Sequence, residues 1–299
     1  MERGIAFPCT ISCNDIMGHF SPLSDEDAIL EEGDVCKIVV GSHFDGFSAQ
    51  TAHTHVCSAN NAKVTGRAAD VVLAAYNSFL AAQRSIKEAS TNTSVTEAIA
   101  AVCAEFDCEP CEGVLSHKLK KHLIDGNDCI INKETPTMRV EELEFAPGDV
   151  YYLDVLVSGG EGKPRESALR CTVFKRELEV QYNLRMKSSR AFFAEVNKKY
   201  PTLPFSIASF EDTTAAKVGI KECCDHDLLV PYPVLIEKDR SIVAQFGCTI
   251  AVQTKSTALL SGNVPFDTKR FESEKSVKKE EIAKLIASDL WVREKQKKK

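Results

Sequence analysis

The 299-residue sequence lacks the long apolar runs and glycine-rich repeats that mark several protein classes. No stretch of 18 or more apolar residues occurs, so the pattern predicts no transmembrane helix. With only 15 Gly and 11 Pro, the chain is neither collagen-like nor of low complexity. The first residues, Met1 to Pro8, lack the apolar region of a signal peptide. We therefore expect an intracellular protein whose thiols are reduced.

Paired cysteine motifs are also scarce, although the chain has 12 Cys. The one Cys-x-x-Cys motif joins Cys108 to Cys111, and no second pair accompanies it as in most zinc sites. The motif also lacks the strand-to-helix setting of a redox site. We expect ordinary buried cysteines, scattered without a disulfide framework. The glycine-rich turn at 159–162 lacks the setting of a phosphate loop, and no cofactor is expected.

Hydrophobic patterning predicts an α+β domain with a mostly antiparallel sheet and helices packed on one face. The Asp45-Gly46 pair predicts a hairpin turn. Thr65 is the expected N-cap of one helix, and a capping box from Ser94 to Glu97 is expected to begin another. The other expected elements are strands at 35–40, 47–57 and 150–157, helical sequence at 188–229, a hairpin of 234–237 with 241–253, and a last helix at 277–294.

Charge is unevenly spread along the chain, whose formal net charge is −6. Residues 269–299 hold eleven Lys or Arg against six Asp or Glu, a local charge of +5, which leaves −11 for the rest. Two interpretations stay open for this basic end. It is either a solvated helix face with a frayed terminus, or a contact for phosphate backbones or a nuclear localisation signal.

Five passages together resemble the type II methionine aminopeptidases, which have the pita-bread fold. They are Gly-His-Phe-Ser-Pro at 18–22 and the segments 33–41, 45–54, 148–154 and 244–249. The segments 4–8, 64–70, 115–117, 123–126, 154–158 and 186–193 are similar to the non-catalytic, proliferation-associated Ebp-type branch. The resemblance implies a pita-bread core at 1–175 and 233–268, a helical insert at 176–232, and a C-terminal helix with a basic tail at 269–299. Relative to the family, an N-terminal helical segment is expected to be missing.

The resemblance also implies where metal ligands would lie, because the aminopeptidases hold two divalent ions with two Asp, one His and two Glu. The matching positions are Val39, Gln50, His117, Asp154 and Gly247. Valine and glycine side chains have no donor atom, and glutamine is neutral, so a dinuclear centre is not expected. The resemblance thus implies a pseudo-aminopeptidase without bound metal, in which His19 is a remnant of the substrate pocket. Asp154 is expected to be hydrogen-bonded, with His117 as the candidate partner.

Two other interpretations of this region stay open. One is a metal-dependent aminopeptidase with a rearranged site, for which His53 and His55 offer a same-face pair. The other is a pocket that still binds peptide N-termini without cleaving them.

Partners follow from the resemblance alone. It implies a regulator of ribosome biogenesis, translation and cell growth that binds ribosomal RNA, the large ribosomal subunit and regulatory proteins. The cytoplasm and the nucleus or nucleolus are the expected locations, no membrane partner is expected, and the oligomeric state stays open. Candidate phosphate contacts are Lys118, Lys120, Lys121, Lys175, Arg176, Arg185, Lys187, Arg190, Lys198, Lys199, Lys295, Lys297, Lys298 and Lys299.

Overall fold

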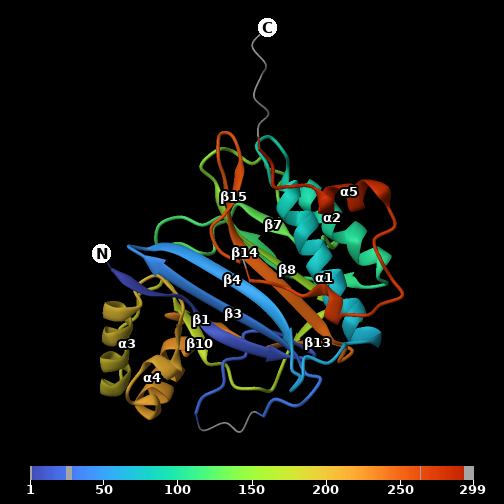
Figure 1. Cartoon of the computed structure of the whole chain (residues 1–299). Coiled ribbons are helices and arrows are strands. Elements are labelled where there is room, and N and C mark those ends of the chain that lie inside the picture. Colours follow the sequence, from blue (N-terminus) through green and yellow to red (C-terminus); the bar gives the residue numbers. More distant parts are fainter. Residues whose placement is uncertain (1, 25–28, 263, 293–299) are drawn as a thin grey trace.

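A seven-stranded antiparallel sheet forms the centre of the computed structural model, which describes residues 2–24, 29–262 and 264–292 (Figure 1). The strand order is β1-β3-β4-β14-β8-β5, and β15 pairs with β14. The strands span Arg3–Cys13 (β1), Val35–Phe44 (β3), Phe47–Val56 (β4), Val243–Val252 (β14), Val150–Ser158 (β8), Glu109–Pro110 (β5) and Thr257–Leu259 (β15). β14 is buried along its whole length, so this sheet is covered on both faces at its centre.

The hairpin between β3 and β4 turns where the sequence predicts it. Asp45 and Gly46 both have positive φ, 50° and 82°, which is the backbone of a two-residue type I′ turn. Phe44 therefore pairs directly with Phe47, and the register continues to Val35 opposite Val56.

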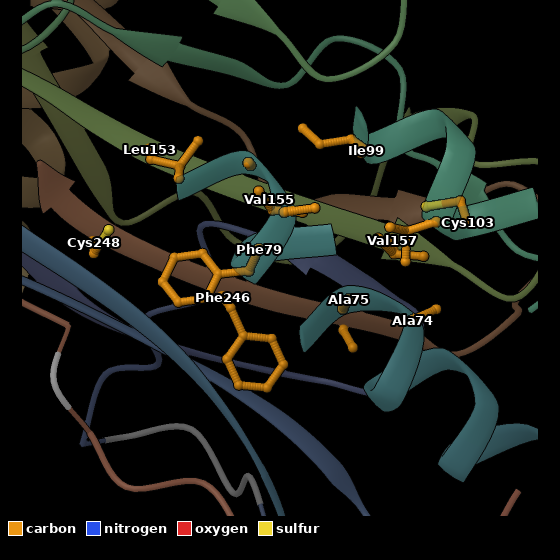
Figure 2. Close-up of a cluster of buried hydrophobic side chains, with 14 of the residues drawn as sticks. Ala74, Ala75, Phe79, Ile99, Cys103, Leu153, Val155, Val157, Phe246 and Cys248 are labelled. Carbon is orange, nitrogen blue, oxygen red and sulfur yellow. The ribbon is translucent and has the colours of Figure 1, made fainter. Parts of the chain in front are cut away.

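The main hydrophobic core lies between this sheet and the helices on one of its faces. The helices are α1 (Gly66–Ser85), α2 (Asn92–Glu105) and α5 (Glu280–Ala287), and Figure 1 shows them gathered on one side. Figure 2 shows Phe79 of α1 and Ile99 of α2 directed at side chains of β8 and β14, among them Phe246. The predicted α+β class, with helices on one face of an antiparallel sheet, is confirmed.

Helix α2 begins three residues before the predicted start. Its N-cap is Thr91, whose side-chain oxygen accepts a hydrogen bond from the backbone N–H of Ser94. The Ser94 hydroxyl in turn donates to the Thr91 carbonyl at 2.6 Å. The predicted capping box is therefore wrong, because Thr91 offers the first unpaired N–H groups an acceptor one turn earlier.

A second, smaller core lies in the insert region. The sheet β11-β10-β12 packs with α3 and α4 around buried residues drawn mostly from 174–229, among them Phe192 and Phe205, with Leu23 added from the N-terminal part. The elements are β10 (Val173–Arg176), α3 (Lys187–Lys199), β11 (Phe205–Ser206), α4 (Thr213–Asp225) and β12 (Leu229–Tyr232). In Figure 1, α3 and α4 lie apart from the helices of the main core.

The predicted hairpin of 234–237 with 241–253 is wrong, since its two strands join different sheets. β13 (Leu235–Glu237) pairs with β2 (Ile16–Gly18) and β9 (Pro164–Glu166), while β14 belongs to the central sheet. The buried Glu237 carboxylate accepts the backbone N–H groups of Gly162, Asp239 and Ser241 and so holds the turn between the sheets. β6 (Leu115–His117) and β7 (Cys129–Ile131) form a separate pair.

The last helix is shorter than the sequence predicts. α5 ends at Ala287, where Ser288 has extended backbone angles and its hydroxyl donates to the Leu285 carbonyl. The end of the predicted helix falls outside the described residues, as do the candidate contacts Lys295, Lys297, Lys298 and Lys299. Among the described helices, none is long and apolar enough to cross a membrane.

The outer face of β1, β3 and β4 carries several exposed apolar side chains. Ile5, Val40, Phe44 and Phe47 expose between 41% and 64% of their surface. Within the described ranges this end of the sheet has no helical layer of the kind that covers β8 and β14 (Figure 1).

Candidate functional site

A row of four residues crosses the central strands on the sheet face away from α1 and α2. Val39 of β3 lies opposite Ala52 of β4, Ala52 opposite Gly247 of β14, and Gly247 opposite Asp154 of β8. Three of the five metal-site positions implied by the resemblance thus share one row. Because side chains of a strand alternate between faces, Gln50 lies on the same face, two residues from Ala52.

Val39, Gln50 and Asp154 border a cavity of about 310 Å³. It is lined by Val39, Gln50, His117, Asp154 and His19 together with mainly apolar neighbours, among them Phe7, Met17, Ile124, Tyr152 and Leu235. The structure therefore brings together all the predicted pocket residues except Gly247, which lies beneath the lining. A mostly apolar wall with few polar groups is typical of a binding pocket.

Asp154 is the central polar group of the cavity. The side-chain amide of Gln245 donates to both of its carboxylate oxygens, at 2.7 and 3.0 Å. Burial raises the pKa of Asp154 from 3.8 to about 6, against the opposing effect of the Gln245 hydrogen bonds. The predicted hydrogen bonding is confirmed, but the predicted partner is wrong. The His117 ring Nδ1 instead lies 2.9 Å from the Gly126 carbonyl oxygen.

Tyr152 occupies the space in which a side chain at position 247 would lie. A Cβ atom added to Gly247 would be 2.8 Å from the Tyr152 hydroxyl and 3.0 Å from the Leu153 carbonyl oxygen. The buried hydroxyl makes no hydrogen bond of normal geometry within the described chain, although it is close enough to Asp154 to lower the pKa of that carboxyl. A glutamate at 247 would have to displace this phenol.

His19 forms part of an aromatic wall of the cavity. Its ring lies edge-on to Tyr232, with ring centroids 5.3 Å apart, and its Nδ1 is 3.0 Å from the Pro233 carbonyl oxygen. Burial lowers the pKa of His19, against the opposing effect of the carbonyl. The imidazole is therefore neutral at pH 7 and serves as a hydrogen-bonded part of the wall.

Two threonine hydroxyls link the backbones of β4 and β14 next to the cavity residues Gln50 and Gln245. Thr54 accepts from the Gln245 N–H and donates to the Gln245 carbonyl. Thr249 does the same with the backbone of Gln50. These hydroxyls satisfy backbone groups where the two strands share only two registered pairs, and they fix the positions of Gln50 and Gln245.

The donor set does not fit the dinuclear metal centre that the resemblance attributes to the aminopeptidases. Of the five matching positions, only His117 and Asp154 carry a side chain that binds divalent ions well. The cavity lining also includes Glu112 and Asp125, but Asp125 forms an ion pair with Lys175. Among the described residues, no group of three or more His, Cys, Asp or Glu side chains is placed to hold an ion.

Two residues of the site were not predicted from the sequence. Gln245 is the partner of Asp154, and Tyr152 fills the space beside Gly247. The period-two alternation of a strand could have identified both, because Gln245 shares a face with Gly247, and Tyr152 shares one with Asp154.

Cys108 and Cys111 of the Cys-x-x-Cys motif are buried, as the sequence predicts. The expectation of burial is wrong for five of the other cysteines, since Cys9 is exposed and Cys13, Cys57, Cys171 and Cys224 are partly exposed. The same-face pair His53 and His55 lies at the other face of the sheet, where the His53 ring packs edge-on against Phe246 with ring centroids 5.3 Å apart.

The basic candidates divide into paired and unpaired side chains. Lys118, Lys175 and Lys199 form ion pairs with carboxylates, which neutralise their charge. Arg176 is partly buried and lies over the Phe193 ring at 5.8 Å. The candidates that are exposed and have no carboxylate partner among the described residues are Lys120, Lys121, Arg185, Lys187, Arg190 and Lys198.

Three of these residues lie on one side of α3. Lys187, Arg190 and Lys198 are spaced three and eight residues apart, which places them along a single helix face. Arg185 lies just before the helix, and we call these four residues the α3 basic face. The Arg190 guanidinium donates to the carbonyls of Leu184 and Arg185, so it also holds the start of the helix.

Comparison with known proteins decides the family. Residues 1–151 match the metallopeptidase family M24. The chain is 41% identical over 282 residues to ERBB-3 binding protein 1 of Solanum tuberosum, covering 93% of this chain and 72% of that protein. The chain belongs to the M24 family. Within it, the chain falls in the branch of ERBB-3 binding protein 1 and the proliferation-associated proteins.

Other M24 relatives support the same branch. Proliferation-associated protein A of Dictyostelium discoideum is 38% identical over 300 residues, covering 100% of this chain and 77% of that protein. A curved DNA-binding protein of Schizosaccharomyces pombe is also 38% identical, over 302 residues, covering 99% and 78%.

The solved structures confirm the pita-bread fold. The structure of a thermophilic Arx1 superposes with a TM-score of 0.87 at 27% identity, covering 97% of this chain and 84% of that one. A methionine aminopeptidase of Thermotoga maritima, with a TM-score of 0.55 at 14% identity, covers 84% and 72% and shares the fold alone.

Proposed function

We propose that this M24 protein is a pseudo-aminopeptidase that acts by binding ribosomal RNA and the large ribosomal subunit. Its role would be to regulate ribosome biogenesis, translation and growth, in the cytoplasm and the nucleus or nucleolus. The observation that carries the loss of catalysis is the row Val39–Ala52–Gly247–Asp154. Three of its four side chains have no metal-binding atom, and the fourth is held by Gln245.

The loss of catalysis has a chemical basis. Metal-assisted peptide hydrolysis needs a bound ion that activates water and polarises the carbonyl group. His117 and Asp154 together offer one imidazole and one carboxylate whose affinity for a proton is raised by burial. Catalytic metal sites hold the ion with about three protein ligands, so these two side chains are too few.

This half of the proposal predicts that the purified protein binds no stoichiometric metal and cleaves no peptide. Elemental analysis after dialysis against cobalt, manganese or zinc should show well under one ion per chain. A cleavage assay with Met-initiated peptides should show no turnover above buffer. One or more ions per chain together with turnover would instead establish the rearranged aminopeptidase.

The RNA-binding half rests on the α3 basic face and the neighbouring basic loop. The Lys175–Asp125 ion pair ties the loop that carries Lys120 and Lys121 to strand β10 of the insert. The four residues of the α3 basic face therefore lie on the insert, and Lys120 and Lys121 lie on a loop that this ion pair ties to it. One M24 relative is named for binding curved DNA, which adds support for a nucleic-acid partner.

We expect the variant with Arg185, Lys187 and Lys198 each changed to Gln to bind purified large ribosomal subunits about tenfold more weakly in 50 mM salt. Each lost phosphate contact should also flatten the slope of log affinity against log salt, by roughly 0.7–0.9. Co-sedimentation across a salt series measures both quantities. Arg190 is left in place because its guanidinium also holds the helix start.

A matched control removes the same charge elsewhere. Lys87, Arg139 and Lys255 are exposed and lie outside both the insert and the basic segment 269–299, so changing all three to Gln should leave the affinity within about twofold. Equal losses in both triple variants would indicate a non-specific effect of net charge. No co-sedimentation of the unaltered protein at low salt would refute ribosome binding.

A further inference from the structure

Three cysteines that are far apart in the sequence meet at one end of the central sheet. Cys13 is the last residue of β1, Cys36 lies near the start of β3, and Cys57 follows β4. The Cys13 and Cys36 sulfur atoms are 2.9 Å apart, and those of Cys36 and Cys57 are 3.6 Å apart. Cys36 is buried between two partly exposed thiols.

The backbone presents Cys13 and Cys36 in a geometry that a disulfide can span. They lie directly opposite each other in the β1–β3 register. At the next pair along, the Asn14 N–H donates to the Val35 carbonyl, so Cys13 and Cys36 occupy a non-hydrogen-bonded position. Such pairs have Cα atoms about 4.5 Å apart, within the range of about 4.4–6.8 Å for disulfides.

The electrostatic surroundings make the two thiols unequal. The S–H of Cys36 hydrogen-bonds to the Cys13 sulfur and, with the Lys37 ammonium group, lowers the pKa of Cys13. The same hydrogen bond and burial raise the pKa of Cys36. Lys37 is fully buried, with its Nζ donating to the carbonyls of Asn14 and Val243 at 2.9 and 3.0 Å. Burial lowers the pKa of Lys37 to about 8, so its ammonium group is mostly charged at pH 7 and attracts negative charge on Cys13.

We propose that Cys13 and Cys36 form a thiol pair that a peroxide oxidises to a disulfide. The Cys13 thiolate attacks one oxygen of hydrogen peroxide, the O–O bond breaks, and a sulfenic acid and hydroxide result. The Cys36 sulfur then attacks the Cys13 sulfur, an S–S bond forms, and the S–OH oxygen leaves as water after taking a proton. Two thiols and one peroxide thus yield one disulfide and two waters.

The second step is favoured by the change in charge at Cys13. A Cys13 thiolate repels negative charge on Cys36, and this repulsion ends when Cys13 becomes a neutral sulfenic acid. The Lys37 ammonium group attracts negative charge on Cys36 and so stabilises its thiolate. Cys57 is farther from Cys36 and not opposite it in the strand register, so it stays a thiol in this step.

Oxidation would also close a loop that contains part of the cavity wall. The segment between the two cysteines includes β2 and His19, and Met17, Gly18 and His19 all line the cavity. A disulfide would close this segment into a covalent loop and restrict it in the unfolded chain. We therefore expect the oxidised protein to unfold at a temperature about 5 °C or more above that of the reduced protein.

The experiment is peroxide treatment of the full-length protein, alkylation of the remaining thiols, and peptide mass spectrometry. No Lys or Arg lies between Arg3 and Lys37, so trypsin releases Cys9, Cys13 and Cys36 in one peptide. A Cys13–Cys36 disulfide leaves that peptide two hydrogens lighter, with one alkylated cysteine. Further cleavage after Glu31 and Glu32 separates the two halves only after reduction.

Variants identify the pair. Cys13→Ser should abolish the disulfide and the rise in unfolding temperature, whereas Cys9→Ser and Cys57→Ser should retain both. Cys9 is the matched control because it is exposed and lies on the same strand. Full alkylation of Cys13 and Cys36 after peroxide treatment would overturn the proposal. So would a disulfide between Cys36 and Cys57, which would link two separate tryptic peptides.

Discussion

Asp154→Asn should stabilise the folded protein by about 1–3 kcal/mol at pH 7.5 and leave its stability unchanged near pH 4. Burial raises the pKa of this carboxyl from 3.8 to about 6. At neutral pH the Asp154 carboxyl is ionised, and its ionisation costs more free energy in the folded protein than in the unfolded chain. A shift of that size corresponds to about 3 kcal/mol at most, and the partial exposure of Asp154 to solvent lowers this figure.

The sign of the pH dependence follows from the direction of the shift. The folded state binds the Asp154 proton more tightly than the unfolded state, so this group contributes its full stability below about pH 4. That contribution is lost as the pH rises through about 6. Asparagine does not titrate, so the difference in unfolding free energy between the variant and the unaltered protein should grow from pH 4 to pH 7.

The asparagine variant also gains a hydrogen bond. The Gln245 side-chain oxygen is buried and has no partner within the described part of the chain. The new amide can donate to this oxygen while its own oxygen accepts from the Gln245 amide.

Denaturant unfolding at both pH values measures the change in stability. Glu274→Gln, at an exposed carboxyl, is the control and should change stability by less than about 0.5 kcal/mol. A less stable Asp154→Asn protein at pH 7.5 would mean that the carboxylate is a required ligand.

Gly247→Glu, which restores the carboxylate implied by the resemblance, should destabilise the protein by roughly 3 kcal/mol or more. Its Cβ atom would approach the Tyr152 hydroxyl to 2.8 Å and the Ala52 Cβ atom to 3.1 Å. The added carboxylate would also lie beside Asp154, which is opposite Gly247 in the strand register. Denaturant unfolding at pH 7.5 measures the loss.

A double-mutant cycle separates the steric part of this effect. Gly247→Ala should cost about 1–2 kcal/mol, and the cost should fall by roughly half in a Tyr152→Phe background, where the nearest contact is gone. Gly18→Ala is the matched control, because this cavity-lining strand glycine has open space for a Cβ atom. Equal costs of Gly247→Ala in both backgrounds would show that Tyr152 does not limit the space at position 247.

Local sequence patterns predicted most of the elements that build the site. Continuous apolar runs predicted β3 and β8, alternation predicted β4, and the Asp45-Gly46 pair predicted the turn, because these signals depend on neighbours in the chain. The start of α2 was misplaced, since Thr91 and Ser94 are both good caps and local pattern alone does not choose between them. The resemblance implied the matching ligand positions. Side chains alternate between the two faces of a strand, which explains why the positions on the central strands share a face.

Contacts between distant segments were beyond the reach of local patterns. The Glu237 carboxylate holds the turn between β13 and β14 by accepting the N–H of Asp239 within the turn and that of Gly162, which lies 75 residues away. The partner of Asp154 was misassigned for the same reason. Gln245 lies 91 residues from Asp154, and only the β8–β14 register brings the two together.

The sequence by itself determined the α+β class and the uneven charge, which depend on residue type and local period. Its resemblance to the aminopeptidases implied that Val39, Gln50 and Gly247 stand at positions where the family has metal ligands. Only the tertiary structure decided that Tyr152 fills the space beside Gly247, that Gln245 holds Asp154, and that Cys13, Cys36 and Cys57 converge. Strand register makes each of these contacts, and register is set by the packing of the whole sheet.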